Sequence, residues 1–224
     1  MKSSPKPEAP ASRKARWVVV AVLAVASLIL ASVAVLWLRP APPQSASAGD
    51  SGVMRVAGSA IGGPFQLVDH NGQTVSQADF AGKFMLIYFG FTHCPDFCPT
   101  ELQIMGNAMD ELGAEGARVV PIFITVDPER DTPESIKDYV AAFHPRMIGL
   151  TGSLAQVEAA AKAYKVYFKK QPGPGGEAGD DYQVDHTVFV YLMGPDGVLR
   201  SMFRHGTSVA VMSGEIRAQL GRAN

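Results

Sequence analysis

The chain has 224 residues, of which 47% are hydrophobic and 18% are charged, and its formal net charge is −1. This length and composition fit one globular domain of ordinary size with an additional apolar segment. The part of the chain after residue 39 is net acidic, and it contains no basic patch with interleaved aromatic residues. Nucleic-acid binding is therefore excluded.

The apolar segment is 17–38, which contains no charged side chain and has Trp17 and Trp37 near its two ends. As a helix, a segment of this length spans about 33 Å and matches a bilayer core of about 30 Å. A cleaved signal peptide is the alternative, but its apolar region usually has only about 7 to 15 residues. We therefore expect a transmembrane helix at 17–38, with a tryptophan near each membrane interface.

The charges that flank this segment predict its orientation. Residues 1–16 carry five basic side chains against Glu8 alone, whereas Arg39 is the only basic residue directly after the segment. By the positive-inside rule, the tail 1–16 is cytoplasmic and the following domain is exported. Residues 39–58 are expected to form a flexible linker, because they are largely Pro, Ala, Ser and Gly up to about residue 52. The exported domain is then 59–224.

A tail of 16 residues is short for a mitochondrial presequence. We therefore expect a bacterial protein that crosses the inner membrane once, with its amino terminus in the cytoplasm and its carboxy-terminal domain in the periplasm.

The exported domain alternates strand and helix patterns. In chain order, these predict strands at 65–69, 74–76 and 84–91, a helix at 99–112, a strand at 119–126, a helix at 133–143, a strand at 147–150, a helix at 154–164, a loop at 169–181, strands at 184–193 and 198–203, and a helix at 209–220. Pro121 indicates that pairing of its strand begins late or that one side is an edge. The alternation predicts an α/β fold with parallel strand pairs.

Two prolines mark the expected starts of helices. Pro99 fits the first helical position, which places Cys98 at or next to the N-cap. Pro133 fits the first position of the next helix, with Asp131 three residues before Glu134 in the spacing of a capping box.

Cys94 and Cys98 are the only cysteines, and they lie between the buried strand 84–91 and a helix start. A disulfide between them would close a very small loop and stabilise the fold little. Two inert buried cysteines are an alternative, but a helix start favours thiolate formation. Because Asp96 and Glu101 bring negative charge nearby, we expect reactive thiols without an unusually low pKa. Such a pair can exchange disulfides or bind a soft metal, and a third ligand would distinguish the two.

His186 is the candidate for that third ligand. It precedes the apolar strand 187–192 and follows the predicted loop. Residues at the ends of neighbouring strands in an α/β sheet meet at one site. From the residues alone, its role as a ligand stays open. The other histidines are expected to be solvated, capping or directed elsewhere: His70, His93, His144 and His205.

Three blocks resemble the signatures of the Sco/SenC family: 89–99 (FGFTHCPDFCP), 126–131 (VDPERD) and 184–187 (VDHT). The similarity extends from about Gly62 to about Gln219. It implies a thioredoxin-like sandwich with a membrane anchor. The family's copper ligands, two cysteines and a distant histidine, fall on Cys94, Cys98 and His186. In thioredoxins a cis-proline followed by threonine faces the cysteine pair, and His186 with Thr187 looks similar to that strand start.

The resemblance also implies the function, a membrane-anchored copper metallochaperone. It would hold one copper, Cu(I) or also Cu(II), receive it from a donor protein and deliver it to the dinuclear copper centre of cytochrome c oxidase. Zinc is an alternative for the same ligands. A second hypothesis is a thiol-disulfide oxidoreductase whose cysteine pair reduces the cysteines of that oxidase subunit. A third is a copper or redox sensor whose loop 170–181 orders on binding.

Overall fold

The computed structural model describes residues 23, 52–55, 60–172 and 182–223. The chain divides into two units, 1–48 and 49–224. The predicted tail 1–16 and the predicted membrane helix 17–38, apart from Leu23, lie outside the described residues, as does most of the predicted linker. Among the residues that are described, none belongs to a helix of the length and apolarity needed to span a membrane.

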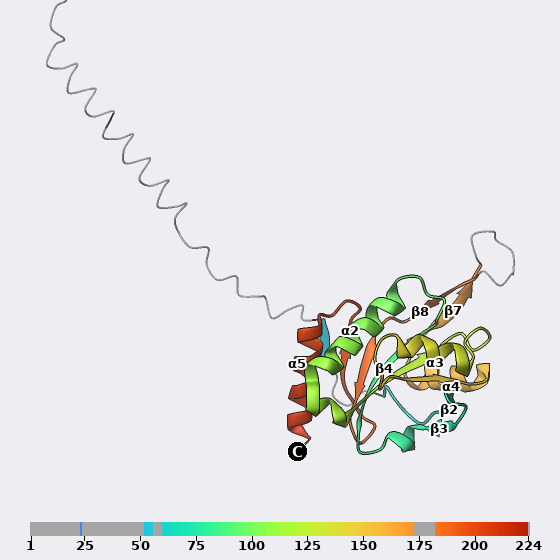
Figure 1. The fold of residues 1–224 in the computed structure, drawn as a ribbon, viewed down its shortest axis with the longest axis horizontal. Helices are drawn as coiled ribbons and strands as arrows, with labels where there is room; N and C mark the ends of the chain where they lie inside the picture. Colours follow the sequence, from blue (N-terminus) through green and yellow to red (C-terminus); the bar gives the residue numbers. More distant parts are fainter. Residues whose placement is uncertain (1–22, 24–51, 56–59, 173–181, 224) are drawn as a thin grey trace, which may run out of the picture. The chain divides into compact units, whose positions relative to one another are not determined.

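An eight-stranded mixed sheet forms the centre of the second unit (Figure 1). Its strand order is β1-β10-β9-β4-β5-β6-β2-β3. The strands are β1 (Val53–Arg55), β2 (Gln66–Asp69), β3 (Thr74–Ser76), β4 (Phe84–Gly90), β5 (Val119–Thr125), β6 (Ile148–Thr151), β9 (Val190–Met193) and β10 (Leu199–Phe203). Strands β4, β5 and β6 are parallel, and β9, β10, β1, β2 and β3 each pair antiparallel to their neighbours. The predicted parallel pairs are confirmed.

Strands β4 and β5 are buried along their whole length, which explains their continuous apolar sequences. Pro121 lies opposite Leu86 of β4, whereas the ladder from β5 to β6 begins one residue later, at Ile122 and Ile148. Proline has no N–H to donate to a ladder. The late start of pairing is therefore confirmed on the β6 side, and β5 is not an edge strand.

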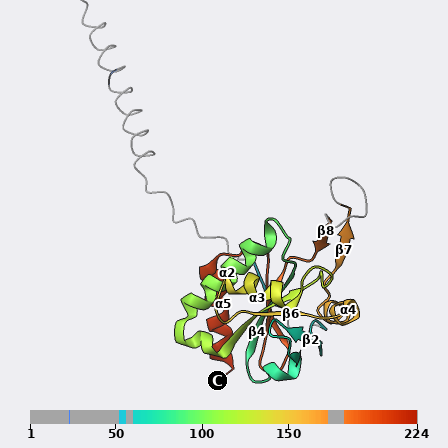
Figure 2. The same ribbon diagram turned by 45° about the vertical axis from the view of Figure 1, so that its right-hand side comes forward.

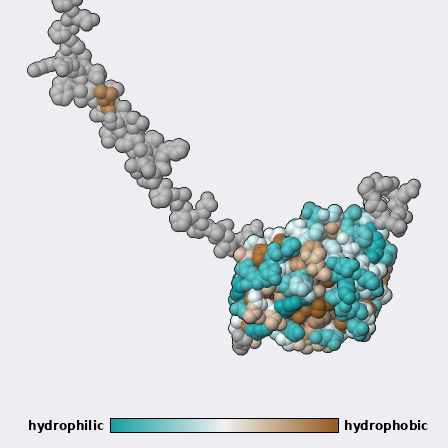
Figure 3. All heavy atoms as spheres, viewed as in Figure 1, coloured by the Kyte–Doolittle hydropathy of each residue, from teal (hydrophilic) through white to brown (hydrophobic). Residues whose placement is uncertain are grey.

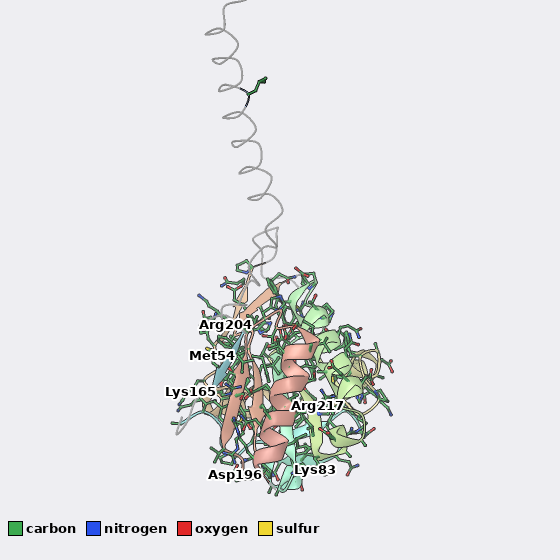
Figure 4. All side chains as sticks on the ribbon, turned by 90° about the vertical axis from the view of Figure 1, so that its left-hand side faces the viewer. Met54, Lys83, Lys165, Asp196, Arg204 and Arg217 are labelled. Atoms are coloured by element: carbon green, nitrogen blue, oxygen red, sulfur yellow. The ribbon has the colours of Figure 1, made fainter. Side chains whose placement is uncertain are left out.

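Within the described residues, the sheet is covered by the helices α2 (Phe97–Leu112), α3 (Pro133–Ala141), α4 (Leu154–Ala163) and α5 (Val209–Arg222). Two short 3-10 helices lie at Gln77–Phe80 and Gly113–Arg118. Figure 4 shows α5 running along the strands, close to Met54 of β1. The face of the domain seen in Figure 3 is mostly hydrophilic, with small separate hydrophobic patches, because most large apolar side chains are inside.

The side chains of β4 alternate between two helical layers. Tyr88 reaches Cys98 of α2, and Phe123, its partner in β5, packs on Tyr139 of α3. Phe89 points to the opposite face, where it packs on Tyr164 at the end of α4. The carboxyl end of β4 and the first turn of α2 therefore meet on the α2 and α3 side of the sheet.

The two helix starts differ in detail from the prediction. Helix α2 begins at Phe97, so Cys98 lies within its first turn and Pro99 at its third position. Proline is tolerated there because the first N–H groups of a helix have no partner within it. Pro133 does begin α3, but its N-cap is Thr132, whose hydroxyl accepts a hydrogen bond from the Ser135 N–H.

Part of the predicted flexible linker 39–58 is a strand. Val53, Met54 and Arg55 form β1, which pairs antiparallel with β10. Val53 and Met54 also pack against the hydrophobic core. The linker prediction is therefore wrong at 53–55, because two apolar side chains and an unfilled sheet edge order these residues.

A separate two-stranded hairpin replaces part of the predicted loop 169–181. Strand β7 (Phe168–Gln171) pairs antiparallel with β8 (Gln183–His186), with Phe168 opposite His186. The predicted strand 184–193 is consequently divided, since residues 187–189 separate β8 from β9. Figures 1 and 2 both show this hairpin extending beyond the main sheet. His186 therefore ends a strand of the hairpin and does not begin a strand of the sheet.

Candidate metal centre

Three elements bring two thiols and an imidazole together. Cys94 follows β4, Cys98 lies in the first turn of α2, and His186 ends β8. The ligand atoms of these three side chains all lie within 4.8 Å of one another. In the described part of the chain, no other group of three His, Cys, Asp or Glu side chains is close enough to hold a metal ion. The structure thus places the three predicted residues at one point.

The cysteine loop is compact, and both of its thiols are free. The Cys94 N–H donates to the Phe91 carbonyl at 3.2 Å, and the Cys98 N–H donates to Cys94 Sγ at 3.4 Å. Cys98 is fully buried, whereas Cys94 is 8% exposed. Cys94 is therefore the thiol that a second molecule can reach.

The two thiols differ in pKa. A hydrogen bond from the Cys98 side chain lowers the pKa of Cys94 most; burial opposes it, and further hydrogen bonds from His186 and backbone N–H groups bring the pKa of Cys94 to about 4. Burial and the adjacent Cys94 sulfur raise the pKa of Cys98. The expectation that neither thiol has an unusually low pKa is therefore wrong for Cys94, because the hydrogen bonds to its sulfur outweigh the effect of burial.

The His186 ring is oriented with Nε2 toward the thiols. Nε2 lies 3.5 Å from Cys98 Sγ, and Nδ1 lies 2.9 Å from the Thr187 carbonyl oxygen. A carbonyl only accepts, so Nδ1 donates to it, and this contact turns Nε2 toward the thiols, where it can bind a metal ion. The ring also has edge-on contacts with Tyr88 and Phe91, with centroids 6.0 Å and 5.8 Å apart.

Two residues of β4 shape the space around Cys98. The buried Tyr88 hydroxyl donates to Cys98 Sγ at 3.8 Å. Gly90 leaves room for the same sulfur, because a Cβ at this position would lie 2.8 Å from it. The sequence showed both residues only as parts of a buried strand.

Asp131 is a further residue whose role the sequence did not reveal. Its buried carboxylate accepts hydrogen bonds from the Thr92 N–H at 3.0 Å, the Thr92 hydroxyl at 2.5 Å and the Thr125 hydroxyl at 2.6 Å. These bonds join the chain two residues before Cys94 to the end of β5. In the sequence, Asp131 stands out only as a member of the block 126–131 and as a candidate residue of a capping box.

The remaining histidines make other contacts. His70 Nδ1 accepts from the Gly149 N–H at 2.9 Å, and His144 Nδ1 accepts from the Arg146 N–H at 3.1 Å. His93 has an exposed side chain whose Nδ1 lies 3.1 Å from the Thr92 hydroxyl.

His205 pairs with Glu101, which is fully buried. Nδ1 of His205 lies 2.8 Å from Oε2 of Glu101. The Gly206 N–H donates to the same oxygen at 3.1 Å. Glu101 is thus partnered in the protein interior, and His205 is neither a solvated residue nor a member of the three-residue group.

The donor set suits one soft metal ion. Thiolates select Cu(I), and imidazole accepts both copper oxidation states and zinc. A zinc site normally has a fourth ligand. No fourth His, Cys, Asp or Glu belongs to the group among the described residues. The three donors therefore suit copper better than zinc in a structural site with four protein ligands.

A family model described as SCO1/SenC matches residues 54–221. The chain belongs to the SCO1/SenC family. Among curated members, the mouse (Mus musculus) "Protein SCO1 homolog, mitochondrial" is 45% identical over 162 residues, which are 71% of this chain and 56% of that protein. The chain spans about half to three fifths of the length of the curated relatives it matches.

Solved SCO1/SenC structures share the fold. Arabidopsis thaliana ScoI with copper bound superposes with a TM-score of 0.66 at 40% identity, covering 73% of this chain and 99% of that one. A second structure is described as showing a disulfide switch in BsSco, a member of the Sco family of cytochrome c oxidase assembly proteins. It superposes with a TM-score of 0.54 at 31% identity, covering 72% of this chain and 91% of that one. The domain therefore has the thioredoxin-like α/β fold, as predicted.

Proposed function

We propose that this protein is a membrane-anchored copper metallochaperone for cytochrome c oxidase assembly. Its domain holds one copper ion, as Cu(I) and also as Cu(II), through Cys94, Cys98 and His186. The observation that carries the proposal is the convergence of two sulfurs and one imidazole nitrogen within 4.8 Å. Copper bound to the Arabidopsis relative supports the choice of metal.

The exposure of the three donors suits transfer by ligand exchange. Cys98 is fully buried, while Cys94 is 8% exposed and His186 is half-buried. An acceptor's ligand can approach from the open side, replace His186 and Cys94 in turn, and leave Cys98 to be released last. The acceptor in this proposal is the oxidase subunit that carries the dinuclear copper centre, and a separate protein donates the copper.

Residues 17–38 anchor the protein in this proposal. The basic tail 1–16 is cytoplasmic, and the copper-binding domain works on the periplasmic side of a bacterial inner membrane. The support is the uncharged length of this segment and the basic residues on one side of it. Fractionation with protease added to intact spheroplasts tests it: the domain should be digested and the tail protected.

Copper titration tests the site. Wild-type protein should bind one Cu(I), and the His186→Ala variant should bind it at least about tenfold more weakly, because a ligand is lost. His93→Ala is the matched control, since His93 adjoins Cys94 but its ring is exposed and directed at Thr92. Equal affinity of wild-type protein and His186→Ala would contradict the three-ligand site. Transfer is then measured as the gain of the dinuclear copper absorption in the copper-free oxidase domain.

A second candidate function is thiol-disulfide reduction, which the unequal pKa values of the two cysteines favour. The Cys94 thiolate would attack a partner disulfide to form a mixed disulfide, and Cys98 would displace the partner. The products are a Cys94–Cys98 disulfide and a partner dithiol, whose thiolate takes up the proton from Cys98. The disulfide switch described for BsSco supports this reaction.

His186→Ala separates the two functions. The two cysteines carry the electron transfer of a reductase, so this variant should retain disulfide reduction of the oxidase subunit while it binds copper more weakly. The sensor hypothesis rests on the loop 170–181, most of which lies outside the described residues. It predicts slower hydrogen exchange in this loop when copper is added.

A further inference from the structure

We propose that Asp127, Arg130 and Tyr182 form a clamp that positions His186, and that the clamp controls copper affinity through this ligand alone. The inference rests on the proposed copper function. It names three positioning residues, none of which belongs to the group of thiols and imidazole.

The need for a clamp follows from the topology. His186 is carried by the β7–β8 hairpin, which forms its own two-stranded sheet, whereas Cys94 and Cys98 are attached to β4 of the main sheet and to α2. The strand ladder of the main sheet does not include β8. The distance from His186 to the thiols therefore depends on the short link 187–189 to β9 and on the side chains that pack the hairpin against the domain, among them Tyr182 and the buried Val184.

Tyr182 makes the contact on the hairpin side, one residue before β8. Its hydroxyl donates to Asp127 Oδ1 at 2.6 Å, and the Arg130 guanidinium carbon lies 3.7 Å from the centre of its ring. A cation at this distance from an aromatic face is attracted by the π electrons. One tyrosine thus binds a carboxylate through its hydroxyl and a guanidinium through its ring.

Asp127 and Arg130 provide the fixed side of the clamp. Asp127 is fully buried two residues after the end of β5, and its N–H donates to the Thr125 hydroxyl at 2.9 Å. Arg130 Nε donates to Asp127 Oδ2 at 2.6 Å, in a largely buried ion pair. The two oxygens of Asp127 therefore hold Tyr182 and Arg130 in one geometry, on a rigid strand end.

The clamp continues to the ligand through Phe91. The Arg130 guanidinium carbon lies 5.9 Å from the Phe91 ring centre, and Phe91 meets the His186 ring edge-on at 5.8 Å. Arg130 thus lies between Tyr182 at the loop end of the hairpin and Phe91 beside the cysteine loop. Lys170, in the other strand of the hairpin, also contacts Tyr182: its ammonium nitrogen lies 4.6 Å from the centre of the Tyr182 ring. The same ammonium forms an ion pair with Glu129.

Loosening the clamp should release the imidazole and leave the dithiol intact. The hydrogen bond of Tyr182 goes to Asp127, whereas the cysteine loop is held by bonds to Asp131 and by the bond to Cys94 Sγ, so a change at Tyr182 removes none of the bonds that hold the loop. Copper would then be held by two sulfurs without a stable third ligand. Residues that orient a metal ligand typically change metal affinity by about 10 to 100-fold when they are replaced.

The test is a double-mutant cycle between Tyr182 and His186, with Cu(I) affinity measured by competition with a chromophoric chelator. Tyr182→Leu in the full chain should weaken Cu(I) binding by about tenfold, and Tyr182→Phe by less, because it keeps the ring over Arg130. Tyr167→Leu is the matched control: this tyrosine precedes β7 of the same hairpin, and its side chain is 60% exposed. The Cu(I) affinity of Tyr167→Leu should stay within about twofold of the wild-type affinity.

The decisive arm is the His186→Ala background. A residue that acts through His186 has no further effect once the imidazole is gone, so the double variant should bind Cu(I) as His186→Ala does. An equal loss from Tyr182→Leu in both backgrounds would show a general structural effect and overturn the proposal, as would wild-type affinity in Tyr182→Leu.

A copper-free measurement separates failure of the clamp from failure of the copper function. The nuclear Overhauser effect between the His186 and Phe91 rings should be present in metal-free wild-type protein and in Tyr167→Leu, and absent in Tyr182→Leu. If wild-type protein binds no copper, the proposed function fails, and this signal still decides the clamp. Persistence of the signal in Tyr182→Leu would refute the clamp.

Discussion

Gly90, the last residue of β4, lies against the sulfur of Cys98 in the first turn of α2. A Cβ on Gly90 would lie 2.8 Å from Cys98 Sγ and 2.9 Å from Tyr88 Cε1. Both neighbours are fully buried, so neither can move toward solvent. The absence of a side chain at this one position allows the strand and the cysteine helix to approach each other.

Gly90→Ala should therefore displace Cys98 and destabilise the domain by about 1 to 3 kcal/mol, the usual cost of overpacking a core. Copper affinity should fall with it, since a ligand atom moves. Urea unfolding and Cu(I) competition measure the two effects. Gly214→Ala is the control, because a Cβ there meets open space in α5, and it should be neutral or slightly stabilising. Wild-type stability and affinity in Gly90→Ala would show that the contact is unimportant.

Tyr88→Phe removes one hydroxyl 3.8 Å from Cys98 Sγ and keeps the ring. A hydrogen bond to a thiolate lowers the energy of the sulfur electrons, so its loss should move the thiolate-to-Cu(II) charge-transfer band to longer wavelength. Stability should change by only about 1 kcal/mol. Tyr164→Phe is the matched control, because its buried hydroxyl has no hydrogen-bond partner among the described residues. A band that stays in place in Tyr88→Phe would exclude this hydrogen bond from the copper-bound site.

Cys94 should react as a thiolate well below neutral pH. Its pKa of about 4 predicts that the rate of iodoacetamide alkylation in the metal-free protein is nearly constant from pH 8 to pH 5 and falls near pH 4. Cys98→Ala removes the side-chain donor to Cys94 and should move this fall toward the ordinary thiol range, about 8.5. Cys98→Ser retains an O–H donor, so the pKa of Cys94 in this variant should stay closer to its wild-type value than in Cys98→Ala. Alkylation of wild-type protein that falls away between pH 8 and 7 would contradict the lowered pKa.

Glu215 should make the domain less stable in acid. Burial alone would raise the pKa of Glu215, but hydrogen bonds from Arg55, Ser201 and Gln219 outweigh it and lower the value to about 2. A carboxyl whose folded pKa is lowered stabilises the fold above its unfolded pKa, and this contribution is lost as pH falls through the folded pKa. Arg55 is largely exposed, so solvent weakens its attraction to Glu215. We therefore expect Glu215 to contribute on the order of 2 kcal/mol to the free energy of unfolding, and this contribution should be lost between about pH 5 and pH 2.

Urea unfolding of wild type and Glu215→Gln at pH 7, 5 and 3 checks this. The variant should be less stable at pH 7, and the difference should shrink toward pH 3. Glu111→Gln, at an exposed position, is the control and should leave the pH dependence of stability unchanged. A constant difference between wild type and Glu215→Gln across this range would show that the charge of Glu215 is not what stabilises the fold.

Local sequence was sufficient for the central strands of the main sheet and for the position of the cysteine pair. The fully apolar runs of β4 and β5 identified central strands, because such strands are buried on both faces. The helical spacing after Cys98 placed the thiols at the start of a helix to within two residues. Prediction was less successful where order depends on distant partners, as in β1, which is ordered by β10 across the sheet edge.

The sequence by itself determined that two thiols follow a buried strand at a helix start, and that a family resemblance points to His186. Tertiary structure decided that His186 Nε2 lies 3.5 Å from Cys98, a residue 88 positions away. It also decided that β8 belongs to a separate hairpin and that Asp131 holds the cysteine loop. The physical reason is that periodicity reports which face of an element is buried, whereas ligand geometry and thiol pKa depend on contacts between segments that only folding brings together.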